Sequence, residues 1–168
     1  MVTTVLPSPL GELTLAAEDG ALTGLWLPAQ KGQPQGLTPG DAPVLDAAKD
    51  WLWRYFAGEA PDPRALPLAP RGSAFSQAVW RLLLEIPYGH TTTYGALAAR
   101  IAAERGLSHM SAQAVGGAVG RNPIAILIPC HRVLGADGSL TGYAGGLARK
   151  RWLLEHEDVA LQTHAGSV

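Results

Sequence analysis

The sequence predicts an α+β fold in which a small α/β domain at the N-terminus precedes a mostly helical domain. Three observations support this prediction: strand-like alternation dominates residues 1–27, a proline-rich segment interrupts the chain at residues 57–73, and helical periodicity dominates after it. A chain of 168 residues with 47% hydrophobic composition can bury a core for one domain or two small ones. We therefore place the domains at residues 1–72 and 73–168.

Short apolar runs in the N-terminal part are separated by turn residues. The runs cover residues 2–6, 12–16 and 21–27, and Asp19-Gly20 is a typical hairpin turn between the second and the third. This spacing predicts a small antiparallel sheet.

A helix is predicted after the sheet. Its apolar positions recur at intervals of three and four residues: Val44, Ala48, Trp51 and Tyr55. Asp41 is the expected N-cap, and the helix should end before Gly58. Residues 57–73 then contain four prolines, which resist regular structure, so we expect the domain boundary there.

Two helices with apolar faces are predicted next. The first is stopped by Pro87 and Gly89, and its face is formed by Phe75, Val79, Leu82, Leu83 and Ile86. Thr91 or Thr92 is the expected cap of the second helix, which runs to Gly106.

A third helix begins near Ser111 and ends by Asn122-Pro123, only a short turn after the second. Two helices joined this tightly predict helix-turn-helix geometry. The third helix is rich in small residues: Ala112, Ala114, Gly116, Gly117, Ala118 and Gly120. Because each glycine costs a helix about 1 kcal/mol relative to alanine, the glycines need another explanation. Tight helix packing and close approach to a nucleic-acid backbone are the two alternatives.

The rest of the chain predicts a strand, two loops and a last helix. Residues 124–128 form a short β-branched run, typical of a buried strand. Asp137-Gly138 marks a turn, residues 142–146 form a glycine-rich loop, and residues 147–157 have the pattern of an amphipathic helix.

Composition and charge exclude several classes of protein. The apolar runs are far shorter than the ~20 residues that span a bilayer, and the N-terminus lacks the pattern of an export signal, so we expect a cytoplasmic protein. The single cysteine excludes an intramolecular disulfide and a closed structural zinc site. Net charge is −1, yet residues 86–168 carry seven Lys and Arg against five Asp and Glu, a weak indication of a surface that approaches phosphates.

Cys130 is the residue whose setting points to chemistry. A lone cysteine is usually a small buried hydrophobe, but this one follows Pro129 and precedes His131 and Arg132. A free thiol has a pKa of about 8.5 and only the thiolate attacks well, so a nucleophile needs a nearby imidazole or positive charge. Since neighbours on a strand point to opposite faces, Cys130 and His131 would have to cooperate through a water or a bend after Pro129.

Several motifs surround this cysteine. They are Asn122-Pro123, the run PCHRV at residues 129–133, Tyr94-Gly95, GYAGG at residues 142–146 and WLLEHE at residues 152–157. Together they resemble the O6-alkylguanine-DNA alkyltransferase family over residues 73–158, and the PCHR core is highly specific. The N-terminal part matches only in its expected layout. The resemblance implies a small α/β N-terminal domain and a helical C-terminal domain whose helix-turn-helix enters the minor groove of DNA.

The resemblance also implies roles for individual residues. Cys130 is similar to the alkyl acceptor, His131 to the base that activates it through a water, and Glu157 to the carboxylate that orients the histidine. Asn122 resembles the residue that braces the active-site turn, and Tyr94 the residue that binds the flipped base and donates a proton toward the leaving guanine. The implied substrate-binding residues are Tyr94, Val133, Tyr143, Ala144 and Gly145. The implied DNA-binding residues are Ser111, Ala112, Gln113, Ala114, Gly116, Gly117, Arg121 and Arg132.

The implied partner is double-stranded DNA that contains O6-alkylguanine, with O4-alkylthymine as an alternative substrate. A base inside a duplex cannot meet a protein thiolate, so it must first be flipped out. The thioether that forms has no leaving pathway in water, so each molecule reacts once. No metal and no cofactor is required, and we expect a monomer without a membrane partner.

Two positions depart from the family pattern. Gln113 stands where family members commonly place an arginine that fills the gap left by the flipped base. Glutamine can occupy the gap but lacks the charge. Ala144 stands where some members have serine, so one side-chain hydrogen bond is absent while the backbone donor remains.

Two other functions compete with alkyl transfer. The chain could be a damage sensor or a helix-turn-helix regulator that binds DNA without transfer, but Cys130 argues against this because such sensors are expected to replace the acceptor. It could also be a cysteine hydrolase that uses Cys130 and His131, but the two residues are adjacent and no cleft signature is evident.

Overall fold

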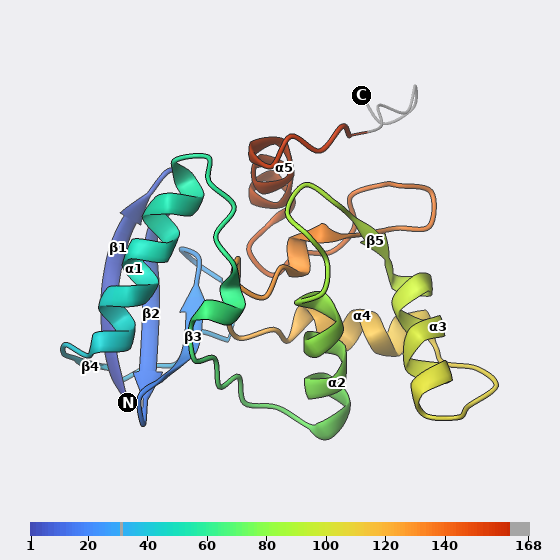
Figure 1. The fold of residues 1–168 in the computed structure, drawn as a ribbon, viewed down its shortest axis with the longest axis horizontal. Coiled ribbons are helices and arrows are strands. Elements are labelled where there is room, and N and C mark those ends of the chain that lie inside the picture. Colours follow the sequence, from blue (N-terminus) through green and yellow to red (C-terminus); the bar gives the residue numbers. More distant parts are fainter. Residues whose placement is uncertain (31, 162–168) are drawn as a thin grey trace.

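The structure, a computed structural model, describes residues 1–30 and 32–161. Its N-terminal part is a four-stranded sheet of order β3-β2-β1-β4 with one helix packed against it (Figure 1). The elements are β1 (Val2–Ser8), β2 (Gly11–Glu18), β3 (Ala21–Trp26), β4 (Thr38–Pro39) and α1 (Pro43–Phe56). Strands β1, β2 and β3 are antiparallel as predicted, but β4 runs parallel to β1, so the sheet is mixed.

Helix α1 begins one residue later than an Asp41 cap would require. Its N-cap is Ala42, which offers no side-chain hydrogen bond, and Pro43 occupies the first turn. Proline suits this position because its missing N–H needs no acceptor and its φ is already helical. The prediction of Asp41 as the cap is therefore wrong. The buried face is the predicted one and includes Val44, Ala48, Trp51 and Tyr55.

The proline-rich segment leads from α1 past the edge of the sheet to the next helix. It contains one 3-10 turn, η1 (Pro63–Ala65). At the edge strand, the Leu22 N–H donates to the Pro67 carbonyl and the Ala69 N–H donates to the Leu22 carbonyl, both at 2.8 Å. Buried apolar residues from both sides of this segment form one continuous cluster. Because one core spans both sides of the segment, the packing does not divide the chain at residue 72, and the domain boundary stays a prediction.

The C-terminal part is mostly helical (Figure 1). Its helices are α2 (Ala74–Leu83), α3 (Tyr94–Glu104), α4 (Ala112–Gly120) and α5 (Leu147–His156). Ser73 and Ser111 cap α2 and α4 through their side chains. Thr93, rather than Thr91 or Thr92, caps α3, because strand β5 (Thr92–Thr93) first pairs in parallel with β6 (Val133–Leu134).

Residues 124–128 form a buried turn, not the predicted strand. A single bridge joins Ile124 to Leu25 of β3, and the chain then turns with Ile126 at φ +72°. The Asn122 side chain braces this turn: its amide nitrogen donates to the Ile128 carbonyl at 2.8 Å, and its oxygen accepts from the Ile124 N–H at 3.0 Å. A β-branched residue rarely adopts positive φ. The turn therefore depends on this bracing, which hydrophobic periodicity does not reveal.

Helix α5 closes the described fold. It buries Leu153 and Leu154, but it also buries Lys150, so its inner face is less apolar than predicted. Along the part of the chain that the structure describes, we find no helix long and apolar enough to cross a bilayer.

Candidate active site

Cys130 opens a short 3-10 turn, η2 (Cys130–Arg132), directly after the turn that Asn122 braces. The predicted strand is absent at this point, so Cys130 and His131 do not alternate across a sheet. The Cys130 N–H donates to the Ile128 carbonyl at 2.8 Å, which fixes the start of η2. The Cys130 side chain lies in the wall of a cavity and is 7% exposed.

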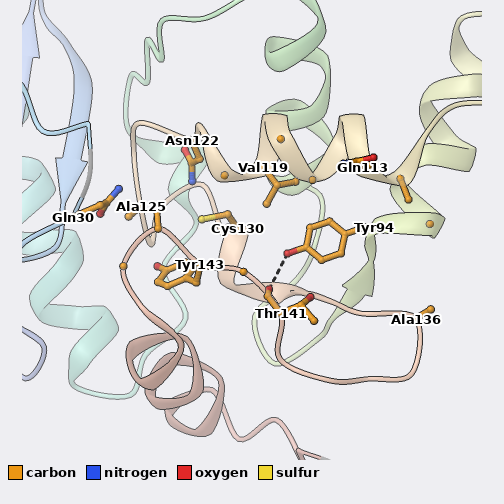
Figure 2. Close-up of a pocket in the computed structure, with 18 residues that line it drawn as sticks. Gln30, Tyr94, Gln113, Val119, Asn122, Ala125, Cys130, Ala136, Thr141 and Tyr143 are labelled. Carbon is orange, nitrogen blue, oxygen red and sulfur yellow. Dashed lines mark hydrogen bonds between the residues drawn. The ribbon is translucent and has the colours of Figure 1, made fainter.

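The cavity has a volume of about 810 Å³, within the range of small-molecule sites. Helices α3 and α4, the turn at residues 122–128 and the loop at residues 141–145 surround it (Figure 2). Four of the predicted substrate-binding residues line it: Tyr94, Tyr143, Ala144 and Gly145. Val133 is instead completely buried in β6 and belongs to the core. Val133 is not among the residues that line the cavity, so its predicted role in substrate binding stays a prediction.

The Lys150 side chain holds the loop at residues 141–142, which forms one wall of the cavity, through hydrogen bonds to its backbone. Its ammonium group donates to the Thr141 carbonyl at 2.8 Å and to the Gly142 carbonyl at 3.3 Å. The Tyr94 hydroxyl donates to the same Thr141 carbonyl at 3.1 Å, and the Lys150 nitrogen lies 5.9 Å from the centre of the Tyr94 ring. Burial lowers the pKa of Lys150 to about 8. Lys150 thus ties the Thr141–Gly142 loop to Tyr94.

The thiol of Cys130 sits among groups with opposing effects. Burial raises the pKa of Cys130, while the Asn122 amide, the Lys150 charge and the Tyr143 hydroxyl lower it. Burial has the largest effect, so the pKa is raised overall and the resting thiol stays protonated at neutral pH. Deprotonation by a base is therefore required before Cys130 can act as a nucleophile.

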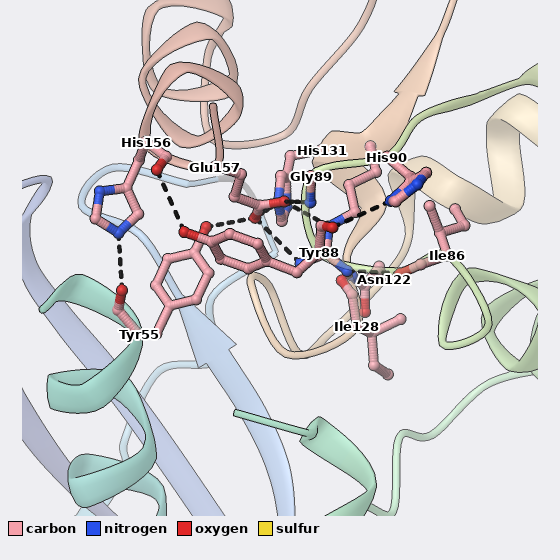
Figure 3. A network of polar contacts seen from close by, with 11 residues as sticks. Tyr55, Ile86, Tyr88, Gly89, His90, Asn122, Ile128, His131, His156 and Glu157 are labelled. Atoms are coloured by element: carbon pink, nitrogen blue, oxygen red, sulfur yellow. Dashed lines mark hydrogen bonds and ion pairs between the residues drawn. The ribbon is translucent and has the colours of Figure 1, made fainter. Parts of the chain in front are cut away.

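Behind η2 lies a buried polar network centred on the Glu157 carboxylate (Figure 3). His131 Nε2 is 2.6 Å from Glu157 Oε2, and the Tyr55 hydroxyl donates to the same oxygen at 2.6 Å. The Gly89 N–H donates to Glu157 Oε1 at 3.2 Å. Arg132 donates through Nε to Oε1 at 2.8 Å and through Nη2 to Oε2 at 3.2 Å. We call these five residues the Glu157 network.

The charges of this network assign the tautomer of His131. Burial alone would raise the pKa of Glu157, but hydrogen bonds from His131 and Arg132 and the charge of Arg132 hold it well below its usual range. Burial also lowers the pKa of His131, so its ring is neutral at pH 7. An ionised carboxylate only accepts hydrogen bonds, so Nε2 carries the proton and Nδ1 is the free basic nitrogen. Nδ1 is buried and has no hydrogen-bond partner among the described atoms.

Arg132 does not occupy the predicted DNA-binding position. Its side chain is 8% exposed, is bound to Glu157, and donates through Nη1 to the Ile86 carbonyl at 2.7 Å. A guanidinium that is buried and paired on both edges cannot also neutralise a phosphate. The prediction of a phosphate contact is therefore corrected: Arg132 supports Glu157.

The other predicted DNA-binding residues lie on or beside α4. Most of them are exposed: Ser111, Ala112, Gln113, Ala114, Gly117 and Arg121. A Cβ added at Gly116 would meet only the Tyr94 ring at an ordinary 3.6 Å, and one added at Gly120 would meet nothing within 4 Å. Tight packing therefore does not explain these two glycines. The alternative, close approach of α4 to a nucleic-acid backbone or groove, stays a prediction.

Three residues near the site were not predicted as functional. The sequence did contain a signal for Lys150. It precedes the buried Leu153, Leu154 and Glu157 at helical spacing, which places a charge on the inner face of α5. Tyr55 was predicted only as an apolar position, and its partner is 102 residues away. Gln30 lies in a loop after β3 and lines the cavity, and no local pattern indicates this.

Comparison with known proteins agrees with this geometry. Residues 1–70 match the ribonuclease-like domain, and residues 74–159 the DNA binding domain, of 6-O-methylguanine DNA methyltransferase. A methylated-DNA--protein-cysteine methyltransferase from Haemophilus influenzae is 42% identical over 158 residues, which are 93% of this chain and 86% of that protein. The protein of the same name from Mycobacterium tuberculosis is 48% identical over 154 residues, 90% of this chain and 89% of the relative.

Solved structures support the same assignment. The crystal structure of Mycobacterium tuberculosis OGT in complex with DNA has a TM-score of 0.82 at 46% identity, covering 94% of this chain and 92% of that chain. The crystal structure of the Mycobacterium tuberculosis O6-methylguanine methyltransferase has a TM-score of 0.79 at 46% identity, covering 93% and 92%. The chain belongs to the 6-O-methylguanine DNA methyltransferase family.

Proposed function

We propose that this protein repairs alkylated DNA by direct reversal, moving the alkyl group of O6-alkylguanine onto Cys130. The observation that carries the proposal is the placement of the chain's single cysteine in the wall of a cavity, next to a neutral histidine that Glu157 orients. The relatives named above are methylated-DNA--protein-cysteine methyltransferases, and in this chain a cysteine acceptor can only be Cys130.

The reaction needs a proton acceptor, a nucleophile and a leaving group. His131 Nδ1 takes the thiol proton through a water, and Glu157 stabilises the imidazolium that forms. The thiolate sulfur attacks the alkyl carbon, the bond between that carbon and guanine O6 breaks, and its electron pair goes to the guanine. Tyr94, which lines the cavity, would donate a proton to the leaving base. The product is a thioether on Cys130, so each molecule is used once.

Helix α4 is the surface that would meet DNA. We propose that α3, α4 and the turn between them act as a helix-turn-helix in the minor groove, with the small residues of α4 allowing close approach. Gln113 lines the cavity mouth and would occupy the gap left by the flipped base. We further propose that the protein acts in the cytoplasm as a monomer on double-stranded DNA.

Intact mass spectrometry after incubation with a duplex that contains O6-methylguanine tests the proposal. We expect one methyl group per molecule, located on Cys130, and no transfer by Cys130→Ala, which should still bind the duplex. Methylation of another residue in Cys130→Ala would refute the assignment. Binding without any mass change would favour a damage sensor, and repeated turnover of a simple thioester would favour a cysteine hydrolase.

A further inference from the structure

Gln30 is the one residue from the N-terminal part among the described residues that line the cavity. It ends a tight turn after β3 in which its N–H donates to the Leu27 carbonyl at 3.1 Å. Its side chain is part of the same turn, since Oε1 accepts from the Leu27 N–H at 3.0 Å. The residue is 8% exposed. A buried side chain from the sheet region therefore reaches the site at which Cys130 would react.

The contact with Leu27 fixes the orientation of the Gln30 amide. Because a backbone N–H can only donate, the atom that faces Leu27 is the oxygen, and the nitrogen faces away from the turn. Figure 2 shows this nitrogen above Ala125. It has no hydrogen-bond partner among the described atoms. This nitrogen is not among the fully buried polar atoms that lack a partner, so it is accessible from the cavity that Gln30 lines. Gln30 therefore presents an N–H donor to an acceptor that enters the cavity.

The turn that carries Gln30 is fixed to the opposite side of the site. A Cβ added at Gly145 would lie 2.2 Å from the Leu27 side chain, so the two residues are in close contact. Arg149 Nη1 donates to the Pro28 carbonyl at 2.8 Å and to the Gly145 carbonyl at 3.2 Å. The N-terminal part is thus pinned to the loop at residues 141–145, and Gln30 keeps its place in the cavity.

The position of Gln30 indicates which part of a substrate it meets. In Figure 2, Cys130 lies between Gln30 and Tyr94. If the guanine lies against Tyr94, as the proposed function requires, an alkyl group longer than methyl must extend past Cys130 toward the other side. That side is lined by Ala125 and Tyr143, with the Gln30 amide as a polar group among them.

We propose that Gln30 is a specificity-determining residue that donates a hydrogen bond to an oxygen acceptor on the alkyl substituent. The inference rests on the proposed function and extends it to the adducts that react fastest. Among substituents of equal length, one with an ether or hydroxyl oxygen should react faster than a hydrocarbon. The factor should be about fivefold, the size of one net hydrogen bond.

Single-turnover rates on two matched duplexes test the proposal. One duplex contains O6-(2-methoxyethyl)guanine and the other O6-butylguanine, whose substituents differ only by an oxygen in place of a methylene group. We expect the wild-type protein to prefer the methoxyethyl adduct by about fivefold. Gln30→Glu retains an oxygen for the Leu27 N–H but removes the amide donor, so the preference should vanish or reverse. The ratio of the two rates cancels any general effect on the thiol.

The same loop offers a matched control. Gln33 is exposed and donates to the Thr14 hydroxyl at 3.2 Å, so Gln33→Glu makes the same chemical change outside the cavity and should keep the preference. Equal wild-type rates on the two adducts would overturn the proposal. So would a preference that survives Gln30→Glu, or one that Tyr143→Phe alone abolishes. An O6-methylguanine duplex is run in parallel, and failure to methylate Cys130 there would refute the proposed function itself.

Discussion

The two sides of the Cys130–Arg132 turn are built in opposite ways. Behind it, the Glu157 carboxylate accepts hydrogen bonds from four other residues, and each of its oxygens has at least two partners. In front of it, Gln30 and Tyr143 line a cavity: the Gln30 amide oxygen is bound to the Leu27 N–H while its nitrogen is accessible from the cavity, and the Tyr143 hydroxyl has no conventional hydrogen-bond partner among the described atoms. The paired side stabilises the fold and orients His131, and the side that lines the cavity is available to a ligand. Nδ1 of His131 is unpaired although His131 belongs to the paired side, so the two sides meet at this atom.

Glu157→Gln should break the paired side and have the largest effect on stability. It removes the counter-charge of a buried guanidinium, and such losses cost about 3–5 kcal/mol. The free energy of unfolding, measured by chemical denaturation, should fall by that order. Glu155→Gln is the matched control, because Glu155 is exposed in the last turn of α5, two residues before Glu157 at its C-cap, and its ion pair with Arg151 is 3.7 Å long. The control should change stability by less than about 1 kcal/mol. Equal losses in both variants would contradict the comparison.

His131→Ala should separate orientation from chemistry. Removing a general base slows a reaction by about 100-fold or more. Because burial raises the pKa of Cys130, the thiolate fraction without a base is small at neutral pH and grows as pH rises. The transfer rate of the variant should therefore climb with pH and recover part of the loss above pH 9. Rates would be measured from pH 6 to 10, with His90→Ala, an exposed histidine, as control. A variant profile parallel to the wild type would count against His131 as the base.

Tyr55→Phe tests the link between α1 and the Glu157 network. The lost hydrogen bond goes to a charged oxygen, so unfolding should become easier by about 1.5–3 kcal/mol. Tyr88→Phe is the control, since its hydroxyl donates to the His156 carbonyl at 3.3 Å in a half-exposed position. That change should cost about 1 kcal/mol or less. If the control costs more than Tyr55→Phe, the network does not extend to α1 energetically.

Gln113→Arg belongs to the side that lines the cavity and should barely affect stability, within about 0.5 kcal/mol. An arginine can stack on bases and meet a phosphate, which glutamine cannot do. It should speed repair of O6-methylguanine in duplex DNA severalfold but leave the reaction with free O6-benzylguanine unchanged, because only the duplex base must be extruded. The salt dependence of duplex binding should steepen by about one ion. Equal acceleration on both substrates would place residue 113 in the chemistry of the cavity instead.

The sequence predicted the elements that depend on local patterns. The three antiparallel strands, the buried face of α1 and the Ser111 start of α4 all follow from alternation, helical spacing and capping chemistry. Predictions failed where long-range contacts decide the conformation. Residues 124–128 have the composition of a strand, but the Asn122 side chain holds them in a turn.

The candidate site divides in the same way. The motif around Cys130 placed Cys130, His131 and Glu157 in one site by resemblance, and the structure brings His131 and Glu157 together and sets Cys130 at the cavity. The resemblance assigned Arg132 to DNA, but in the structure it pairs with Glu157, which lies 25 residues away and so leaves no local signal. Gln30 has no local signal, since long-range contacts of its turn with Gly145 and Arg149 bring it to the cavity.

The raised pKa of Cys130 also affects the protein before it meets a substrate. A protein that reacts only once is inactivated without repairing DNA if oxidants or other electrophiles modify its cysteine first. Oxidation and adventitious alkylation both follow thiolate character and exposure, and the resting Cys130 is protonated and 7% exposed. Burial therefore slows the chemical inactivation of Cys130 in the substrate-free protein. The same burial means that the thiol must be deprotonated when a substrate binds. The fraction of protein still able to react after storage with hydrogen peroxide would measure this protection directly.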